Sequence, residues 1–335
     1  MTVAQSSASE EASPPLAPPP QASWWRTTWP ILIGIAFTLA LIAGSLFIGV
    51  YDIRGAEDGW NMFGITRVPR TIALALAGAA MAMCGLVMQL LTQNKFVEPT
   101  TTGTTEWAGL GLILTMVMIP GASLLTRMVG AIIFALVGTI VFFLFLQRVT
   151  LKSSLIVPIV GIMLGAVVGS VSSYVALKTD MLQQLGIWFA GSFTGVVRGR
   201  YELLFIVLVV LVLIFIAADR FTVAGLGKDI ATNVGLNYRR VLFLGILMIA
   251  VVTVVVGNLP FLGLIVPNIV SMFRGDNLRS NLPWVAMLGM WILIICDIIA
   301  RTVIMPFEVP VSLILGILGA VVFVFLLVRS RRYAR

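Results

Sequence analysis

The feature that most constrains this chain is a series of apolar runs of about twenty residues, separated by short polar segments. A helix rises about 1.5 Å per residue, so a run of that length crosses the roughly 30 Å hydrocarbon layer of a bilayer. We place the runs at about 30–50, 71–92, 104–120, 124–147, 155–177, 201–218, 241–257, 259–274, 282–302 and 310–328. The sequence therefore predicts an all-α polytopic membrane protein with about ten transmembrane helices.

The third and eighth runs are short and rich in Gly, Pro or Thr. Proline cannot donate a backbone hydrogen bond, and irregular backbone at membrane depth must lie inside the protein. We therefore expect Pro260, Gly263 and Pro267 to reduce the eighth run to a shorter, bent helix.

Composition agrees with a membrane protein and excludes several function classes. Hydrophobic residues make up 59% of the chain and charged residues 11%, whereas roughly a quarter of a soluble domain is charged. The chain has no histidine, and Cys84 and Cys296 lie inside apolar runs without the spacing of a metal site. We predict no metal site and no cofactor, and we attribute the net charge of +8 to basic cytoplasmic loops rather than to nucleic-acid binding.

The two ends of the chain are predicted to be cytoplasmic. Residues 1–27 are rich in Pro, Ser, Ala and Glu, which predicts a disordered cytoplasmic tail before a membrane domain at 28–335. With both termini inside, more of the 22 lysines and arginines fall on the inner side than on the outer side, as the positive-inside rule requires.

One long polar stretch interrupts the apolar runs, "GLGKDIATNVGLNYRR" at 225–240. Gly227, Ala231 and Gly235 are each four residues apart, a spacing that places them on one face of a helix and lets another backbone approach closely. We expect this helix to lie at the inner surface and to offer its small face to a partner. The alternative is an ordinary solvated loop that contains glycines.

Several blocks of the sequence resemble the permease subunits of iron–siderophore and vitamin B12 ABC importers (FecCD-like permeases). The blocks are "RVPRTIALALAGAAMAMCGLVMQ" (67–89), "NKFVEPTTTGTTEWAG" (94–109), "FLGLIVPNIV" (261–270) and "CDIIARTVIMPFEVPVSLILGILGAVVFVFLL" (296–327), together with the polar stretch. Lys95 stands where the family usually has Pro, and Asn268 where it usually has His. The resemblance runs from about residue 30 to the end, and its wording is most similar to permeases for catecholate siderophores.

The resemblance implies an ATPase-coupling role for the polar stretch, as a cytoplasmic helix around 221–240. The coupling residues would be Gly227, Lys228, Asp229, Ala231 and Gly235, although Lys228 reverses one charge of the acidic pair usual in the family. The implied partners are a cytoplasmic ABC ATPase dimer, a soluble or lipid-anchored substrate-binding protein, a second permease subunit (homodimer or heterodimer) and membrane lipid.

The outer arginines Arg67, Arg70 and Arg301 would, by the same resemblance, meet acidic residues of the binding protein. A guanidinium suits bidentate pairing with a carboxylate. The alternatives are interfacial snorkelling and local pairing. For Arg301 the local partner would be Asp297, four residues earlier on the same helix.

The second apolar run is crowded with alanine and glycine, which favours either tight helix packing or a translocation path. In the latter case Met81, Met83, Met88 and Gln89 would face the path. Glu98 and Glu106 flank the third run, and we expect them to serve a structural role at the inner interface or a role in gating.

We therefore predict the membrane permease of an ABC importer that moves a ferric siderophore across the inner membrane of a bacterium. The chain lacks a G-x-x-x-x-G-K-[ST] loop, so it is not itself an ATPase. The substrate could instead be vitamin B12, haem or another metal chelate. An ion-coupled secondary transporter is the competing class, and an intramembrane enzyme lacks a catalytic set.

Overall fold

The computed structural model describes residues 24–49, 59–148, 156–198, 202–275 and 277–333, and every regular element in these ranges is helical. The α-helices are α1 (Trp24–Phe47), α2 (Gly59–Met62), α3 (Val68–Leu91), α4 (Thr104–Met118), α5 (Leu124–Arg148), α6 (Ile156–Lys178), α7 (Leu182–Phe189), α8 (Phe205–Ile216), α9 (Ala218–Gly225), α10 (Lys228–Asn233), α11 (Tyr238–Val256), α12 (Leu262–Arg274), α13 (Leu278–Thr302) and α14 (Val311–Tyr333). Shorter turns are the π-helical η1 (Phe63–Arg67) and the 3₁₀ turns η2 (Pro99–Thr102) and η3 (Glu202–Leu204).

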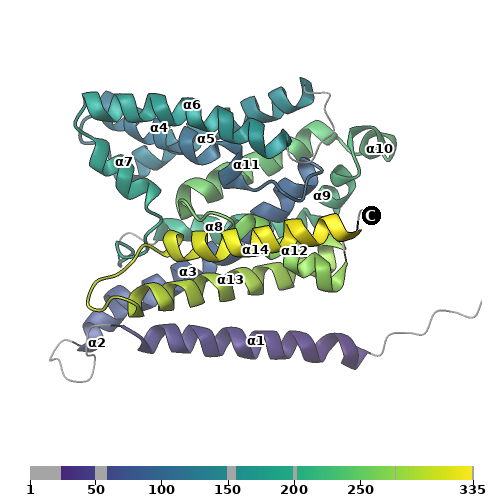
Figure 1. The fold of residues 1–335 in the computed structure, drawn as a ribbon, viewed down its shortest axis with the longest axis horizontal. Coiled ribbons are helices and arrows are strands. Elements are labelled where there is room, and N and C mark those ends of the chain that lie inside the picture. Colours follow the sequence, from purple (N-terminus) through teal and green to yellow (C-terminus); the bar gives the residue numbers. More distant parts are fainter. Residues whose placement is uncertain (1–23, 50–58, 149–155, 199–201, 276, 334–335) are drawn as a thin grey trace, which may run out of the picture.

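The long helices run along the longest axis of the molecule, so their ends collect at two opposite poles (Figure 1). The Trp24 end of α1, the C-terminal end of α14 and the short helices α9 and α10 lie at one pole, which we call the α10 end. The short helices α2 and α7 and the turn at 303–310 lie at the other pole, which we call the α2 end.

Six of the described helices are long and apolar enough to cross a membrane, and a seventh span is obtained if the bent pair Glu202–Ile216 and Ala218–Gly225 is taken as one. Three shorter apolar helices, Thr104–Met118, Leu262–Arg274 and Val311–Leu326, complete the set. Every predicted apolar run overlaps one of these helices. Most bounds shift by a few residues, whereas the second span begins at Trp60 instead of residue 71. The third and eighth runs are the short helices α4 and α12, as their Gly and Pro content indicated.

Helix α3 is the axis of the bundle, because it packs against α1, α8, α9, α11, α12 and α13. Two of its glycines lie directly against glycines of other helices, Gly78 against Gly289 of α13 and Gly85 against Gly263 of α12. A Cβ atom at either α3 position would overlap the facing backbone. The small residues of this run therefore allow backbone-to-backbone packing, the first of the two alternatives considered above.

The polar stretch is not one helix over 221–240, which corrects the predicted coupling helix. It forms two short helices, α9 and α10, before α11 begins at Tyr238. Gly227 and Gly235 flank α10 with φ of 104° and 87°, a backbone conformation that ends helices and that glycine adopts without steric cost.

The predicted disordered tail is also too long by four residues, because α1 already begins at Trp24. The rest of that tail lies outside the described residues. Pro267 does not end the eighth helix, since it lies inside the continuous helix α12, whereas Pro260 precedes that helix.

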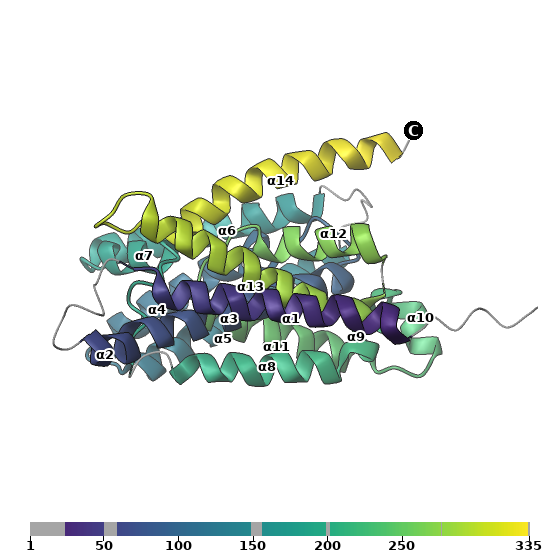
Figure 2. The ribbon, with the colours of Figure 1, turned by 90° about the horizontal axis from the view of Figure 1, so that it is seen from below.

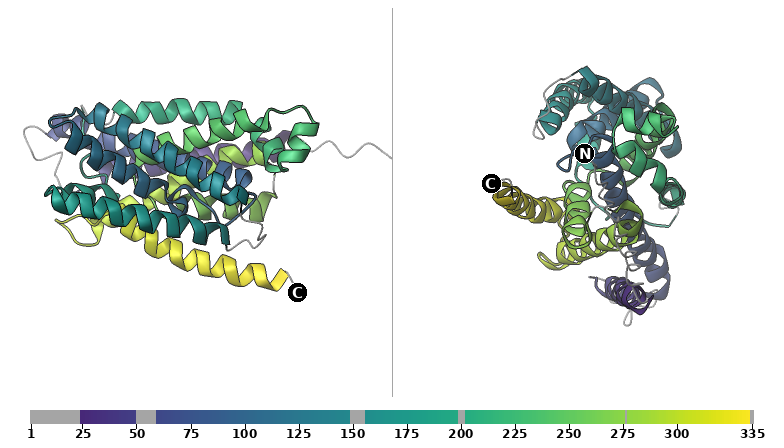
Figure 3. Two further views of the ribbon diagram at one scale, coloured as in Figure 1. Left: turned by 90° about the horizontal axis from the view of Figure 1, so that it is seen from above. Right: turned by 90° about the vertical axis from the view of Figure 1, so that its right-hand side faces the viewer.

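Helix α14 leaves the bundle as it approaches its C-terminal end (Figure 2), and the same departure is visible from the opposite side (Figure 3). Its exposed face is apolar along most of its length, with Leu313, Ile317, Val321, Val324 and Phe325 all more than half exposed. An apolar face of this kind requires lipid or another apolar protein surface to cover it.

Candidate functional site

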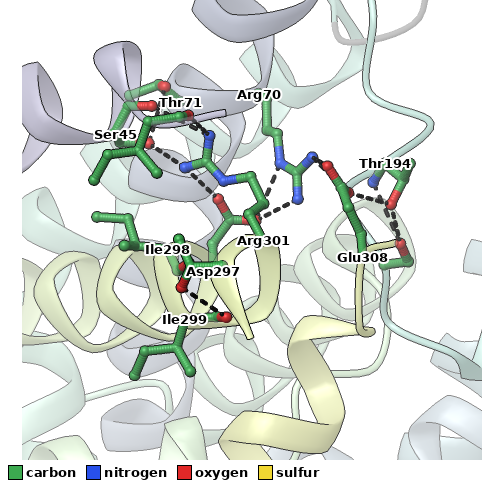
Figure 4. Close-up of polar contacts among 12 residues, drawn as sticks. Ser45, Arg70, Thr71, Thr194, Asp297, Ile298, Ile299, Arg301 and Glu308 are labelled. Carbon is green, nitrogen blue, oxygen red and sulfur yellow. Dashed lines mark hydrogen bonds and ion pairs between the residues drawn. The ribbon is translucent and has the colours of Figure 1, made fainter. Parts of the chain in front are cut away.

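Arg70, Arg301 and two carboxylates gather at the α2 end of the bundle (Figure 4), and Arg67 lies beside them. They come from η1, α3, α13 and the 303–310 turn, and we call them the arginine cluster: Arg67, Arg70, Asp297, Arg301 and Glu308. The sequence prediction singled out the three arginines. Arg301 lies more than 200 residues after Arg67 and Arg70 in the sequence, and the fold brings the three together.

Arg70 lies between the two carboxylates. Its Nε and Nη2 donate to Asp297 Oδ1 at 3.1 and 2.7 Å, and its Nη1 donates to Glu308 Oε1 and Oε2 at 2.9 and 2.8 Å. Asp297 is fully buried and also has Arg301 Nη2 at 2.7 Å from its Oδ2, within ion-pair distance but outside hydrogen-bond alignment. A buried carboxylate is costly unless it is paired, and two guanidinium groups provide that pairing here.

Arg67 and Arg301 also bind the C-terminal end of α1. Arg67 donates to the carbonyl oxygens of Leu46 and Phe47, each at 3.1 Å, and Arg301 donates to the carbonyl oxygen of Ser45 at 3.2 Å. The last carbonyls of a helix lack partners within the helix and carry its negative dipole end, so cations are stabilising there. Sequence analysis anticipated the Asp297–Arg301 pair but not this capping of α1.

A cavity of about 250 Å³ opens beside the arginine cluster and is lined by all three arginines and by Glu308. Among the described residues that line the cavity, three carry a guanidinium group and one carries a carboxylate. Such a cavity suits an anionic group, above all a carboxylate.

The polar segment at the α10 end presents a different face from the one predicted. Ala231 is fully buried against its own chain, whereas Gly227 is partly exposed and Gly235 is exposed, so the three residues do not form one exposed face. The small side chain of Ala231 lets α10 pack closely onto the body of the bundle.

The exposed side of this segment carries an apolar stripe of Leu226, Ile230 and Val234, which are 56%, 50% and 71% exposed. Ile230 and Val234 are four residues apart on α10 and at its C-cap, so they share one side of that helix, whereas Leu226 lies at the end of α9, before the break at Gly227. Lys228 and Asp229 are exposed beside the stripe. We call the three apolar side chains the apolar stripe. The stripe can be found in the sequence, because each of its residues directly precedes one of the small residues Gly227, Ala231 and Gly235.

The methionines predicted to face a translocation path lie in the core instead. Met81 and Met88 are fully buried and Met83 is 3% exposed, all on the central helix α3. This burial supports a packing role and does not support their exposure to a path. Within the described part of one chain, the three thioethers are enclosed by neighbouring helices.

Gln89, the fourth predicted path residue, supplies a hydrogen bond that α12 lacks at Pro267. Pro267 has no N–H, so the carbonyl of Gly263, four residues earlier, loses its helical partner. Gln89 Nε2 donates to that carbonyl at 3.3 Å and to the carbonyl of Leu264 at 3.4 Å. Gln89 also lines a cavity of about 340 Å³ at the α10 end, next to Gly225 of α9.

Glu98 caps the first turn of α12 from a loop that follows α3. Its Oε1 accepts from the Phe261 N–H at 2.8 Å and its Oε2 from the Leu264 N–H at 3.1 Å, while Thr100 Oγ1 donates to Oε1 at 2.7 Å. A carboxylate at a helix N-terminus satisfies free N–H groups and complements the helix dipole. These contacts favour the structural role expected for Glu98. Glu106, on α4, has a buried Oε2 without a hydrogen-bond partner next to Gly165 of α6.

Comparison with known proteins places these features in a family. The model of the FecCD transport family matches residues 31–329. A petrobactin import system permease protein of Bacillus anthracis is 59% identical over 330 residues, which cover 97% of this chain and 98% of that protein. The chain belongs to the FecCD transport family.

Other relatives of this FecCD chain extend the match. A ferric-anguibactin transport system permease protein of Vibrio anguillarum is 37% identical, covering 87% of this chain and 96% of that protein. The structure of an ABC transporter of the metal-chelate type, in an inward-facing conformation, superposes with a TM-score of 0.76. It covers 90% of this chain and 99% of that chain at 23% sequence identity, so it shows a shared fold.

Proposed function

We propose that this FecCD chain is the membrane permease of a bacterial ABC importer and that its cargo is a ferric siderophore of the catecholate type. The observation that carries the proposal is the 59% identity, over nearly the whole chain, to a petrobactin import system permease protein. Because the sequence has no ATP-binding loop, a separate ATPase supplies the energy.

The proposed topology has ten spans, with both termini in the cytoplasm. The six long helices, the bent pair and the three short apolar helices provide the ten segments. The Trp24 end of α1 and the C-terminal end of α14 share a pole with α10, which supports a common side for both termini and the coupling segment (Figure 1).

The ATPase is proposed to dock on the apolar stripe at the α10 end. Exposed aliphatic side chains on a short helix that projects from the bundle offer an anchor for a groove on a partner. Gly227, Ala231 and Gly235 then act indirectly, because they set the two breaks and the close packing that hold α10 against the bundle. Lys228 and Asp229 would contribute polar contacts at the edge of the same surface.

The first test is Ile230→Asp in the complete importer, reconstituted in proteoliposomes with its ATPase. A charge in the centre of an apolar contact is poorly tolerated, so ATP-driven uptake of ferric petrobactin should fall by at least tenfold while the chain stays folded. The measurement is uptake together with co-purification of the ATPase.

The matched control is Thr232→Asp, which adds the same charge to another exposed face of the same helix. It should leave uptake within about twofold of the unchanged protein, since exposed surface substitutions are usually small in effect. Equal loss in both variants would contradict docking on the stripe. Uptake by the chain alone on an ion gradient, without ATPase or ATP, would contradict the importer proposal itself.

The binding protein is proposed to dock at the α2 end, where Arg67, Arg70 and Arg301 line the charged cavity. Complementary charge at this pole would speed the encounter of the two proteins and fix their register. Around the cavity, the 303–310 turn exposes Ile304, and Phe307 is 74% exposed, which adds apolar contact area.

A second permease subunit is proposed to cover part of the apolar face of α14. The helix departs from its own bundle (Figures 2 and 3). Exposed apolar side chains follow one another along it from Leu313 to Phe325. The partner is either a second copy of this chain or a related permease, and lipid covers the remaining apolar surface. Native mass spectrometry of the purified complex distinguishes the two compositions.

A further inference from the structure

We infer that Glu308 is an exchangeable ion-pair partner of Arg70. When the binding protein docks, one of its carboxylates replaces Glu308 at the Arg70 guanidinium. The inference rests on the proposed docking of a binding protein at the α2 end and adds a mechanism to it. In the free permease Glu308 holds the site, and its displacement releases the 303–310 turn that leads into α14.

The two carboxylates bound to Arg70 differ in a way that makes only one of them replaceable. Asp297 is fully buried and pairs with two arginines, whereas the Glu308 side chain is 23% exposed and lines the cavity. Arg70 Nη1 donates to both oxygens of Glu308, a geometry that any carboxylate reproduces. Glu308 therefore binds the more exposed side of the Arg70 guanidinium, while the buried Asp297 binds the other side.

An occupant is needed in the free state because of where Arg70 lies. The Arg70 side chain is 10% exposed. A nearly buried cation that loses one of its partners is costly. Exchange of one carboxylate for another avoids that cost, because the charge and the hydrogen bonds of Arg70 are the same before and after.

The position of Glu308 connects the exchange to the rest of the chain. Within the described residues, the side chain of Glu308 ties the 303–310 turn to Arg70 of α3 and to Thr194, which donates to Oε2 at 3.0 Å. The turn also has backbone hydrogen bonds of its own, such as that from the Val309 N–H to the Ala300 carbonyl. Loss of the Glu308 contacts would therefore loosen the turn without unfolding α13. Since α14 starts at Val311, docking at one pole is transmitted to a helix that runs to the other.

The test measures the affinity of the purified petrobactin-binding protein, loaded with ferric petrobactin, for the complete importer in nanodiscs. Glu308→Gln removes the competing charge while keeping the size of the side chain. Arg70 is then available more often, and the binding protein should bind roughly fivefold more tightly. Thr194→Val removes the hydroxyl that holds Glu308, and it should tighten binding in the same direction by a smaller factor.

Asp180→Asn is the matched control. Asp180 is exposed at the same pole between α6 and α7 and has a φ of 56°, which asparagine tolerates. It removes one negative charge without touching the arginine cluster. The binding protein should bind the Asp180→Asn importer with the same affinity as the unchanged importer. Equal tightening by Asp180→Asn and Glu308→Gln would overturn the inference, because general electrostatics would explain both.

A second measurement follows the turn directly, with spin labels at Phe307→Cys and Trp60→Cys. Both positions are exposed, and the native cysteines are fully buried and remain unlabelled. The distance distribution should be narrow in the free importer and broad after docking, and already broad in Glu308→Gln. A distribution that stays narrow on docking would overturn the exchange. Absence of any binding to the unchanged importer would instead overturn the proposed docking function, and the exchange with it.

Discussion

At the scale of single residues, three polar side chains bind backbone groups that lack a partner within their own helix. Gln89 supplies the hydrogen bond that Pro267 cannot make, Glu98 caps α12, and Arg67 caps the end of α1. Each side chain reaches its partner across a helix boundary. Without water in the hydrocarbon, an unpaired N–H or C=O costs several kcal/mol, so these contacts are part of the fold.

The Gln89 contact gives a stability prediction. Gln89→Leu leaves the Gly263 carbonyl without a partner and should lower the free energy of unfolding by roughly 1–3 kcal/mol. Thermal unfolding of the purified permease in detergent measures the change. Gln183→Leu, at an exposed position on α7, is the control and should leave the melting temperature unaltered. An unaltered melting temperature in Gln89→Leu would mean that the Gly263 carbonyl has another hydrogen-bond partner in that variant.

Sequence reasoning found the three arginines and Asp297 of the arginine cluster but missed Glu308, and it assigned the arginines too few partners. The Asp297–Arg301 pair follows from their four-residue spacing, so it was predictable. The contacts of Arg70 with Glu308 and of Arg67 with α1 join segments distant in sequence, and local spacing carries no information about them. The methionines of α3 were placed on a path because composition alone does not distinguish a packed face from an open one.

At the scale of elements, the close approach of α3 to α12 and α13 depends on glycine. Gly85→Ala places a methyl group against the backbone of Gly263, where no flexible side chain can move aside. We expect a loss of about 1–3 kcal/mol in stability, the cost of overpacking a core.

The control for this substitution is Gly44→Ala on α1, where an added Cβ meets nothing within 4 Å. It should be neutral or slightly stabilising, because alanine favours the helix by roughly 0.5–1 kcal/mol over glycine. Thermal unfolding of the two variants, measured side by side, separates the contact from the general effect of replacing glycine. Equal melting temperatures would contradict backbone-to-backbone packing at Gly85.

The bounds of the long helices were largely predictable from the sequence, whereas the structure of the coupling segment was not. Apolar length located all the major helices, because the bilayer imposes it. The segment around 221–240 has no such constraint. There the glycine spacing was interpreted as one face of a single helix. In the structure Gly227 and Gly235 both adopt positive φ, the first between α9 and α10 and the second between α10 and α11.

At the scale of the whole molecule, the two poles present different surface features. One presents the arginine cluster and its cavity, and the other presents the apolar stripe and the ends of α1 and α14 (Figure 1). This polarity matches a protein that meets different partners on the two sides of a membrane.

The polarity also gives a test of the proposed topology. Asp180 and Thr232 are exposed at opposite poles, and the native Cys84 and Cys296 are buried. In intact cells a membrane-impermeant thiol reagent should label Asp180→Cys and leave Thr232→Cys unlabelled. In inverted vesicles the pattern should reverse. Labelling of both positions from one side would contradict the ten-span topology.

The cap on α12 has a consequence for how the chain is built into the membrane. Helix α12 has 13 residues, about 20 Å of helix, which is too short to cross the hydrocarbon as an independent span. Its first N–H groups are satisfied by Glu98, which precedes Phe261 by 163 residues and is therefore synthesised much earlier. We therefore expect α12 to enter the bilayer against the first half of the chain, which is already synthesised when α12 is made.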